Sequence, residues 1–246
     1  MKRKINSYIR SLIGIFLIFS NVLFTSQSIH CIDIKNESLN IEDESVNAYV
    51  KFANYLDVDY EELQDKLVSV VEDKEYRLAP LNNVEKHRIF FKKIFSSCDE
   101  NYMKFYARGK RLSEEEAENN FQGRLKRMWE NKLPGHMTLI VELNKECVGL
   151  ISLGPLKMYG FDPEIAYIVD QDHCGKGVGL KSVKLTIDFL QYLKDKGTYD
   201  FKCLKATVHP LNVGSYKILE KSGFECEEGI KIFSYGERKS YTYNFL

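Results

Sequence analysis

The feature that most constrains the fold is a strand, a glycine-rich loop and an amphipathic helix that follow one another directly. Residues 165–169 are apolar or β-prone, and the loop after them carries Gly175, Gly177 and Gly179 at alternate positions. From Gly177 to about Lys196, apolar residues recur every three or four positions, which predicts one buried helical stripe. Glycines let a ligand approach the backbone and a helix N-terminus favours anions, so this segment predicts a phosphate-binding turn.

Spacing excludes two common phosphate-binding loops. A Walker loop needs Gly-Lys followed by Ser or Thr, whereas Lys176 is followed by Gly177. The dinucleotide fingerprint GxGxxG needs a third glycine where this chain has Leu180. A glycine-rich turn also occurs with a purely structural role, so the rest of the chain must decide.

Periodicity places further elements around this unit. Ser113 and Glu116 form a capping box, and Asn144-Lys145 suits a two-residue hairpin turn. We expect an α/β (α+β) fold with a mixed, mostly antiparallel central sheet and helices on both faces. Strands are expected at 76–81, 136–143, 146–153, 164–169, 202–208, 224–227 and at the C-terminus, and helices at 83–96, 113–131, 177–196 and 212–222, with helical spacing through 46–71.

A second segment, His209–Phe224, follows at a fixed distance and changes the interpretation. It contains Asn212-Val213-Gly214-Ser215 and closes with Glu220-Lys221-Ser222-Gly223-Phe224. Together with the glycine loop, it resembles the two signature segments of the GNAT superfamily. Arg77–Leu81, Tyr106–Lys110, Ser113–Glu115 and Trp129 fall in the order typical of its ribosomal-protein and small-amine branch. The resemblance extends over about Tyr76–Leu246.

The resemblance implies acetyl-CoA as co-substrate. The loop amides would hold its pyrophosphate, the preceding strand would pair with the pantetheine arm, and Asn212 would contact the pantetheine. Six scattered cysteines without a CxxC pair predict no metal site. The cofactor-binding residues expected are Ile168, Val169, Cys174, Gly175, Lys176, Gly177, Val178, Gly179, Leu180, Asn212 and Ser215. A bulky residue at Gly177 or Gly179 should abolish CoA binding without unfolding the domain.

The expected reaction is direct attack of a primary amine of a protein N-terminus, a lysine or a small molecule on the thioester. Glu164, which opens the loop-bearing strand, is the candidate base, and its alternative role is a solvated carboxylate. His209 is a second candidate, or part of a turn before Pro210.

Two positions depart from the family pattern. Cys174 stands where Gln or Arg usually opens the loop, and Leu219 replaces the tyrosine that protonates the thiolate in many relatives. Ser215 or Tyr216 is the candidate replacement acid. These departures keep open an alternative, a non-catalytic acyl-CoA-binding or degenerate interaction module. The formal net charge of zero disfavours a nucleic-acid partner.

The N-terminus resembles an export signal. Lys2, Arg3, Lys4 and Arg10 precede an apolar run over residues 12–24, which is short for a membrane span. Cleavage after Ser28 and secretion are expected, with an uncleaved anchor or a core helix as alternatives. We expect three parts: a signal peptide or anchor (1–28), an acidic linker with a helical extension (29–75) and the acetyltransferase domain (76–246). Export raises a further alternative, an effector that acts in another cell.

Overall fold

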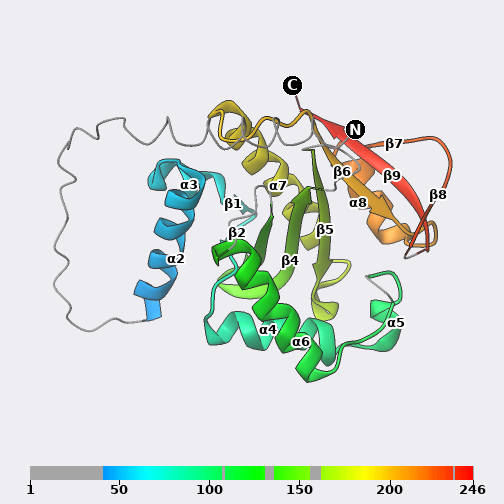
Figure 1. The fold of residues 1–246 in the computed structure, drawn as a ribbon, viewed down its shortest axis with the longest axis horizontal. Helices are drawn as coiled ribbons and strands as arrows, with labels where there is room; N and C mark the ends of the chain where they lie inside the picture. The colour runs from blue at the N-terminus through cyan, green and yellow to red at the C-terminus, as the bar shows by residue number, and fades with distance from the viewer. Residues whose placement is uncertain (1–40, 107–108, 131–135, 156–161, 235, 246) are drawn as a thin grey trace, which may run out of the picture. The chain divides into compact units, whose positions relative to one another are not determined.

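A nine-stranded mixed sheet organises the chain, with the strand order β1-β2-β3-β4-β5-β6-β9-β7 and β8 paired to β9 (Figure 1). This computed structural model describes residues 41–246 except 107–108, 131–135, 156–161, 235 and 246. Neighbouring strands are antiparallel except β5 and β6, which are parallel. The strands are β1 Val68–Val71, β2 Lys74–Pro80, β3 Met137–Leu143, β4 Glu146–Pro155, β5 Pro163–Val169, β6 Cys203–Val208, β7 Glu225–Cys226, β8 Lys231–Phe233 and β9 Gly236–Asn244.

Helices cover both faces of this sheet. Figure 1 shows α4 and α6 in front of the central strands and α7 behind them, and α7 contacts β2, β4 and β5. The helical segments are α2 Ile41–Leu56, α3 Tyr60–Lys66, α4 Glu85–Ser96, α5 Glu100–Met103, α6 Glu114–Leu125 with a π-helical turn Lys126–Glu130, a 3-10 turn Gln171–His173, α7 Val178–Asp195 and α8 Val213–Lys221. The predicted mixed, mostly antiparallel sheet with helices on both faces is confirmed.

Local sequence signals explain the boundaries of several elements. Ser113 and Glu116 form both hydrogen bonds of the capping box at the start of α6. Asn144 and Lys145 have φ angles of 49° and 72°, the left-handed backbone that a two-residue hairpin between β3 and β4 requires. The apolar stripe of α7 is buried, with Val183, Phe189 and Leu193 fully enclosed. Burial of each such side chain stabilises the fold by about 1.5–3 kcal/mol.

Three elements differ from the expectation. Residues 68–71 form strand β1 and not a helix, because Glu72 and Asp73 turn the chain with φ angles of 52° and 59° and pair β1 with β2. The short helix α5 and the strand β8 were not expected. In each case a tertiary contact supports a segment too short for periodicity to reveal.

The segment before Tyr76 packs into the same unit as the residues after it. The compact unit runs from Leu39 to Leu246, and Phe52 of α2 contacts Phe189 of α7 with ring centroids 6.1 Å apart. Leu63 and Leu67 are fully buried. The predicted signal or anchor segment, 1–28, lies outside the described residues. Among the described helices, none combines the length and apolar character needed to cross a bilayer.

Candidate active site

The candidate site lies where two central strands part. Strand β5 pairs with β4 along its whole length, from Pro163 to Val169. On its other edge β5 pairs with β6 only at Glu164 and Lys205. Before this point Asp162 joins the strands by accepting hydrogen bonds from the amides of Lys202 (2.7 Å) and Cys203 (3.3 Å). Beyond Glu164 the edge of β5 therefore faces a gap rather than a neighbouring strand.

Asp170 anchors the loop that leaves β5. Its carboxylate is buried and accepts hydrogen bonds from Lys93 Nζ of α4 at 2.6 Å and from His173 Nδ1 at 3.2 Å. Burial alone would raise the pKa of Asp170, but these hydrogen bonds hold it below its ordinary value. These hydrogen bonds therefore hold the start of the loop against helix α4.

The glycine loop has the geometry of an anion site. Gly175 and Gly177 have φ angles of 75° and 82°, and a Cβ at either position would meet no atom within 4 Å. Gly177 is the N-cap of α7, no side chain caps the helix, and its first turn carries no acidic residue. The first amides of this 18-residue helix are consequently available to a negatively charged group. The loop thus fits a pyrophosphate.

Gly179 has a different role from the one expected. A Cβ there would lie 2.8 Å from Ile218 Cδ1 of α8 and 3.4 Å from Val169 Cγ2. A bulky side chain at Gly179 would therefore press on Ile218 and Val169 inside the protein, and the expected loss of binding without unfolding stays a prediction there. Gly177, with open space around it, allows that prediction to be tested without such a contact.

Helix α8 brings hydroxyl groups to the gap. Asn212 is the N-cap of α8 and accepts a hydrogen bond from the Ser215 amide at 3.2 Å. The side chain of Tyr167 reaches α8 from β5, and its hydroxyl donates a hydrogen bond to the Ser215 carbonyl at 3.0 Å. The same hydroxyl lies 2.8 Å from the Ser215 hydroxyl. Tyr216 is not among the described residues that line the cavity, and its ring lies 5.5 Å from Lys239 Nζ.

Glu164 is half-buried at the end of the gap where β5 and β6 still pair. Its Oε1 accepts a 2.8 Å hydrogen bond from Thr207 of β6. Burial raises the pKa of Glu164, and the Thr207 hydrogen bond opposes this only in part. A carboxylate with a raised pKa is a better proton acceptor than a solvated one. His209 also lines the cavity, with its ring 5.0 Å from that of Phe105, and its Nδ1 accepts from the Leu211 amide.

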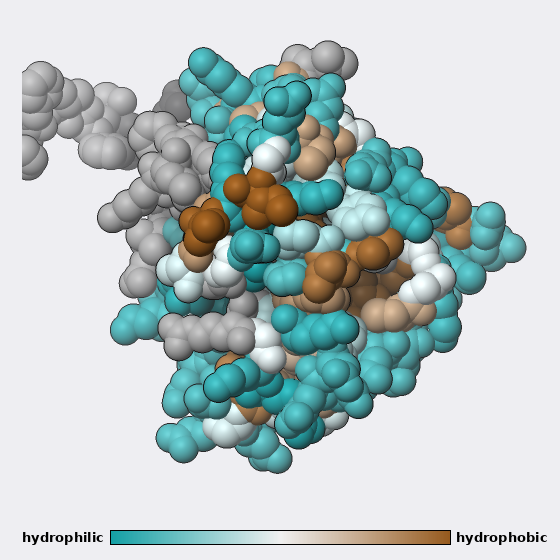
Figure 2. Space-filling model, turned by 90° about the vertical axis from the view of Figure 1, so that its right-hand side faces the viewer, coloured by the Kyte–Doolittle hydropathy of each residue, from teal (hydrophilic) through white to brown (hydrophobic). Residues whose placement is uncertain are grey.

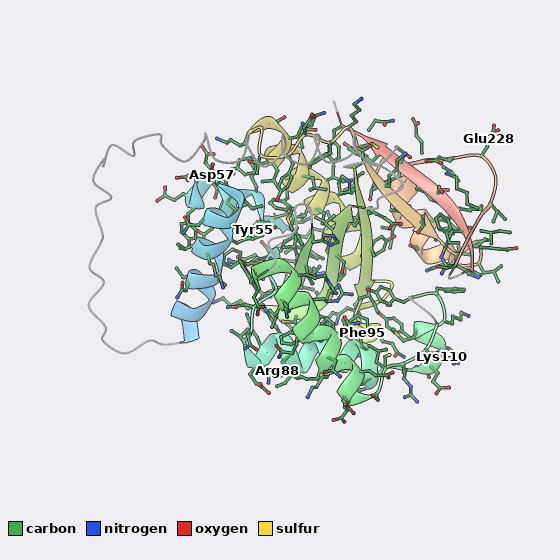
Figure 3. The ribbon with its side chains drawn as sticks, in the orientation of Figure 1. Tyr55, Asp57, Arg88, Phe95, Lys110 and Glu228 are labelled. Atoms are coloured by element: carbon green, nitrogen blue, oxygen red, sulfur yellow. The ribbon has the colours of Figure 1, made fainter. Side chains whose placement is uncertain are left out.

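These groups share one cavity of about 1440 Å³. Figure 2 shows the face of the molecule that carries α5, α8 and β8, hollowed between apolar and hydrophilic side chains. Phe95 and Lys110, labelled in Figure 3, belong to the wall on the side of α4–α6. Of the predicted cofactor residues, all but Lys176 line this cavity: Ile168, Val169, Cys174, Gly175, Gly177, Val178, Gly179, Leu180, Asn212 and Ser215.

The resemblance implies that residues 96–133 contribute to the acceptor side, but sequence reasoning named no single residue of this opposite wall of the cavity. Tyr102 belongs to α5, Phe105 follows it and Arg124 belongs to α6, whereas Tyr167 and Thr207 come from the parted strands. Glu164 and Ala166, and likewise Lys205 and Thr207, are two positions apart, which is typical of one face of a strand. This spacing does not predict which two strands of the sheet part. Leu219, at the position of the usual tyrosine, is fully buried.

The cysteines and the C-terminal aromatic residues also have assigned places. Cys98, Cys147, Cys174, Cys203 and Cys226 are free thiols, and Cys31 lies outside the described residues. Burial raises the pKa of Cys174, which does not favour a nucleophilic thiolate. Tyr241 and Phe245 are buried, and Tyr243 packs against Phe224 and Phe245, so this strand end contributes to the core.

Known proteins resemble this chain in sequence and in fold. A family model described as an acetyltransferase (GNAT) domain matches residues 77–225. A curated relative, the probable N-acetyltransferase YjcK of Bacillus subtilis (strain 168), is 27% identical over 148 residues, which cover 59% of this chain and 72% of the relative.

Solved structures share the fold at low sequence identity. RimL, described as a ribosomal alpha-N-protein acetyltransferase in complex with coenzyme A, has a TM-score of 0.54 and 16% identity, over 72% of this chain and 97% of that one. RimJ of Mycobacterium smegmatis, in complex with a CoA-disulfide, has a TM-score of 0.53 and 17% identity, over 69% and 82%. The aminoglycoside acetyltransferase AAC(6')-Ib, in complex with coenzyme A, has a TM-score of 0.51 and 16% identity, over 69% and 93%.

Proposed function

Because this chain belongs to the GNAT acetyltransferase family, we propose that it transfers the acetyl group of acetyl-CoA to a primary amine, with Glu164 as the general base. The observation that carries the proposal is the gap between β5 and β6. It places a half-buried carboxylate, an unpaired strand edge and a helix N-terminus in one cavity. These are the three groups that an amine, a thioester and a pyrophosphate require.

The chain's own groups account for binding and orientation. The loop amides from Gly175 to Gly179 bind the pyrophosphate, and the unpaired edge of β5 at Ile168 and Val169 hydrogen-bonds the pantetheine amides. Acetyl-CoA supplies a thioester whose carbonyl carbon bonds to the amine nitrogen while the bond to sulfur breaks. Glu164 accepts the proton that the nitrogen loses, directly or through one water, and its raised pKa suits this role.

The charges in the cavity indicate which amines it accepts. Among the described residues that line the cavity, Glu164 is the only one with a carboxylate, whereas six are lysines or arginines. Lys104, Lys110, Arg124 and Arg238 lie outside both the glycine loop and α8. We infer that the acceptor is an amine next to acidic groups, such as the N-terminus of an acidic polypeptide, because a polycation would meet like charge.

Two measurements on the full chain test this proposal. Calorimetry should detect saturable acetyl-CoA binding, and thiol release should follow the addition of a peptide with an acidic N-terminal sequence. Peptides with basic N-terminal sequences and a polyamine should react more slowly. Glu164→Gln should lower turnover about 10²–10⁴-fold with acetyl-CoA binding retained. Glu228→Gln is the matched control, because Glu228 is exposed on the segment between β7 and β8 (Figure 3).

Each outcome has a distinct meaning. No acetyl-CoA binding by the folded chain would overturn the proposal. Binding without turnover on any amine would instead support a non-catalytic acyl-CoA-binding module, the reading that Cys174 and Leu219 kept open. Faster reaction with the polyamine would leave acetyl transfer in place and refute the inferred acceptor class.

A further inference from the structure

A cluster of metal-ligating side chains lies on the sheet away from the candidate active site. His87 of α4, Glu142 of β3 and Cys147 of β4 place one ligand atom each within 4.8 Å of one another. Glu142 and Cys147 are direct partners across the β3–β4 hairpin, so both side chains lie on the same face of the sheet. None of the three lies among the described residues that line the candidate active-site cavity.

His87 supplies independent evidence that this cluster is a binding site. The side chain is only 3% exposed, and its Nδ1 accepts a hydrogen bond from the Asn82 amide at 3.2 Å. Its Nε2 is inaccessible to solvent and has no hydrogen-bond partner among the described residues. A buried polar atom without a partner disfavours the folded state, so such atoms are rare. Because Nδ1 accepts a hydrogen bond, Nε2 carries the imidazole proton, and a metal ion beside the carboxylate and the thiol would satisfy this nitrogen once that proton has moved to Nδ1.

The charges of the cluster fit a divalent cation. Burial lowers the pKa of His87 to about 4, so the imidazole is neutral and can bind a metal. Glu142 is 5% exposed, and its Oε1 accepts a 2.6 Å hydrogen bond from Lys86 Nζ, which leaves its second oxygen for another ligand. Burial and the nearby Glu142 raise the pKa of the Cys147 thiol to about 12. The thiol is therefore protonated at neutral pH in the metal-free protein.

We propose that His87 Nε2, the second carboxylate oxygen of Glu142 and Cys147 Sγ bind one Zn²⁺ ion, with water as the fourth ligand. Nitrogen, sulfur and oxygen together are typical zinc ligands, whereas Mg²⁺ and Ca²⁺ prefer oxygen alone. One thiolate and one carboxylate balance the charge of the ion, which a mostly buried site requires.

Proton balance adds two consequences. Binding expels the proton of Cys147, and the imidazole proton moves from Nε2 to Nδ1. The Asn82 amide then loses its acceptor and faces a second donor at Nδ1, so the imidazole must turn from Asn82 when the metal binds. Each Zn²⁺ ion should therefore release about one proton at neutral pH.

The site also shows why spacing in the sequence predicts no metal here. His87 precedes Glu142 by 55 positions, and no pair of these residues matches a zinc motif. The fold alone joins them, by packing α4 on the β3–β4 hairpin. A bound ion would clamp these elements together.

The test uses the full untagged chain, stripped with a chelator and titrated with Zn²⁺ alone against a competing indicator. We expect one tight site and a higher thermal transition after one equivalent. Co²⁺ should give the absorption of a four-coordinate thiolate complex. Cys147→Ser and His87→Gln should each weaken Zn²⁺ binding by more than about 100-fold, since even outer partners contribute 10–100-fold.

Cys203→Ser is the matched control, because Cys203 is also a free thiol on a strand and is buried. It should bind Zn²⁺ like the parent chain. Unfolding curves without metal separate misfolding of a variant from loss of a ligand, and alkylation of the parent chain gives a second measurement, in which Zn²⁺ should slow labelling of Cys147 but not of Cys226. Unchanged Zn²⁺ affinity in a folded Cys147→Ser variant, or no proton release, would overturn the proposal.

Discussion

The contact between Gly179 and Ile218 allows a quantitative test of how helix α8 supports the glycine loop. A methyl group at Gly179 would lie 2.8 Å from Ile218 Cδ1, closer than packed carbon atoms approach. Cδ1 is the far end of a flexible side chain and can move aside, so Gly179→Ala should cost about 1 kcal/mol, the low end of the range for overpacking. The helix preference of alanine offsets up to about 1 kcal/mol of this cost. The free energy of unfolding should therefore change by less than about 1 kcal/mol.

Removal of Cδ1 isolates the collision. Ile218→Val deletes that atom and costs about 0.5–1.5 kcal/mol alone. The nearest neighbours of the new methyl group are then Val169 Cγ2 at 3.4 Å and Cγ1 of residue 218 at 3.9 Å. In that background Gly179→Ala should be neutral or stabilising by up to about 1 kcal/mol. The two substitutions should thus be coupled by about 1 kcal/mol.

Urea unfolding of the four proteins measures this coupling, and calorimetry with acetyl-CoA follows the loop. Gly177→Ala is the control, because its new methyl group meets no atom within 4 Å but must adopt a φ angle of 82°. That strain should cost about 1–2 kcal/mol whether residue 218 is isoleucine or valine. Additivity of Gly179→Ala and Ile218→Val within about 0.5 kcal/mol would refute the packing argument.

Two predictions concern carboxylates. Glu164→Gln should leave the free energy of unfolding at neutral pH unchanged or increased. Burial raises the pKa of Glu164, so the ionised carboxylate disfavours the folded state above that pKa. A clear loss of stability in urea would contradict this. Hydrogen bonds from Lys231, Thr242 and Lys205 lower the pKa of Glu227 from 4.5 to about 2. The stabilisation from ionised Glu227 is complete above pH 4.5 and is lost as the pH falls towards 2. In Glu227→Gln, stability should therefore depend less on pH over that range when acid unfolding is followed by circular dichroism. An unchanged pH dependence would argue against these hydrogen bonds.

Local rules explain why the loop-bearing half of the fold could be predicted. The stripe of α7, the glycines at 175 and 177 and the turn at Asn144-Lys145 each follow from backbone geometry within a few residues. The positions of Asn212 and Ser215 likewise follow from the cap of α8. The residues expected to bind the cofactor therefore emerge from sequence because they belong to contiguous segments with their own conformational signals.

Long-range pairing explains what could not be predicted. Val68–Val71 has helical spacing, yet pairing with β2 makes it a strand. Lys104 and Arg124 line the same cavity as the gap between β5 and β6, although they lie in distant segments of the sequence. Only the packing of those segments in the fold brings them together. His87 and Cys147 meet in the same way. The acceptor side and the proposed metal site thus depend on tertiary contacts that no motif encodes.

In the proposed reaction, Leu219 removes the usual proton donor, and the rate then depends on the general base. Leu219 is fully buried and cannot donate a proton. The hydroxyls of Ser215 and Tyr167, 2.8 Å apart, line the same cavity, and burial raises the pKa of Tyr167, so its phenol stays protonated at neutral pH. A CoA thiolate is weakly basic, so it leaves without full protonation, whereas an amine must lose a proton to form the amide. The rate should therefore depend on Glu164 far more than on any acid, and the absence of the tyrosine is compatible with an active enzyme.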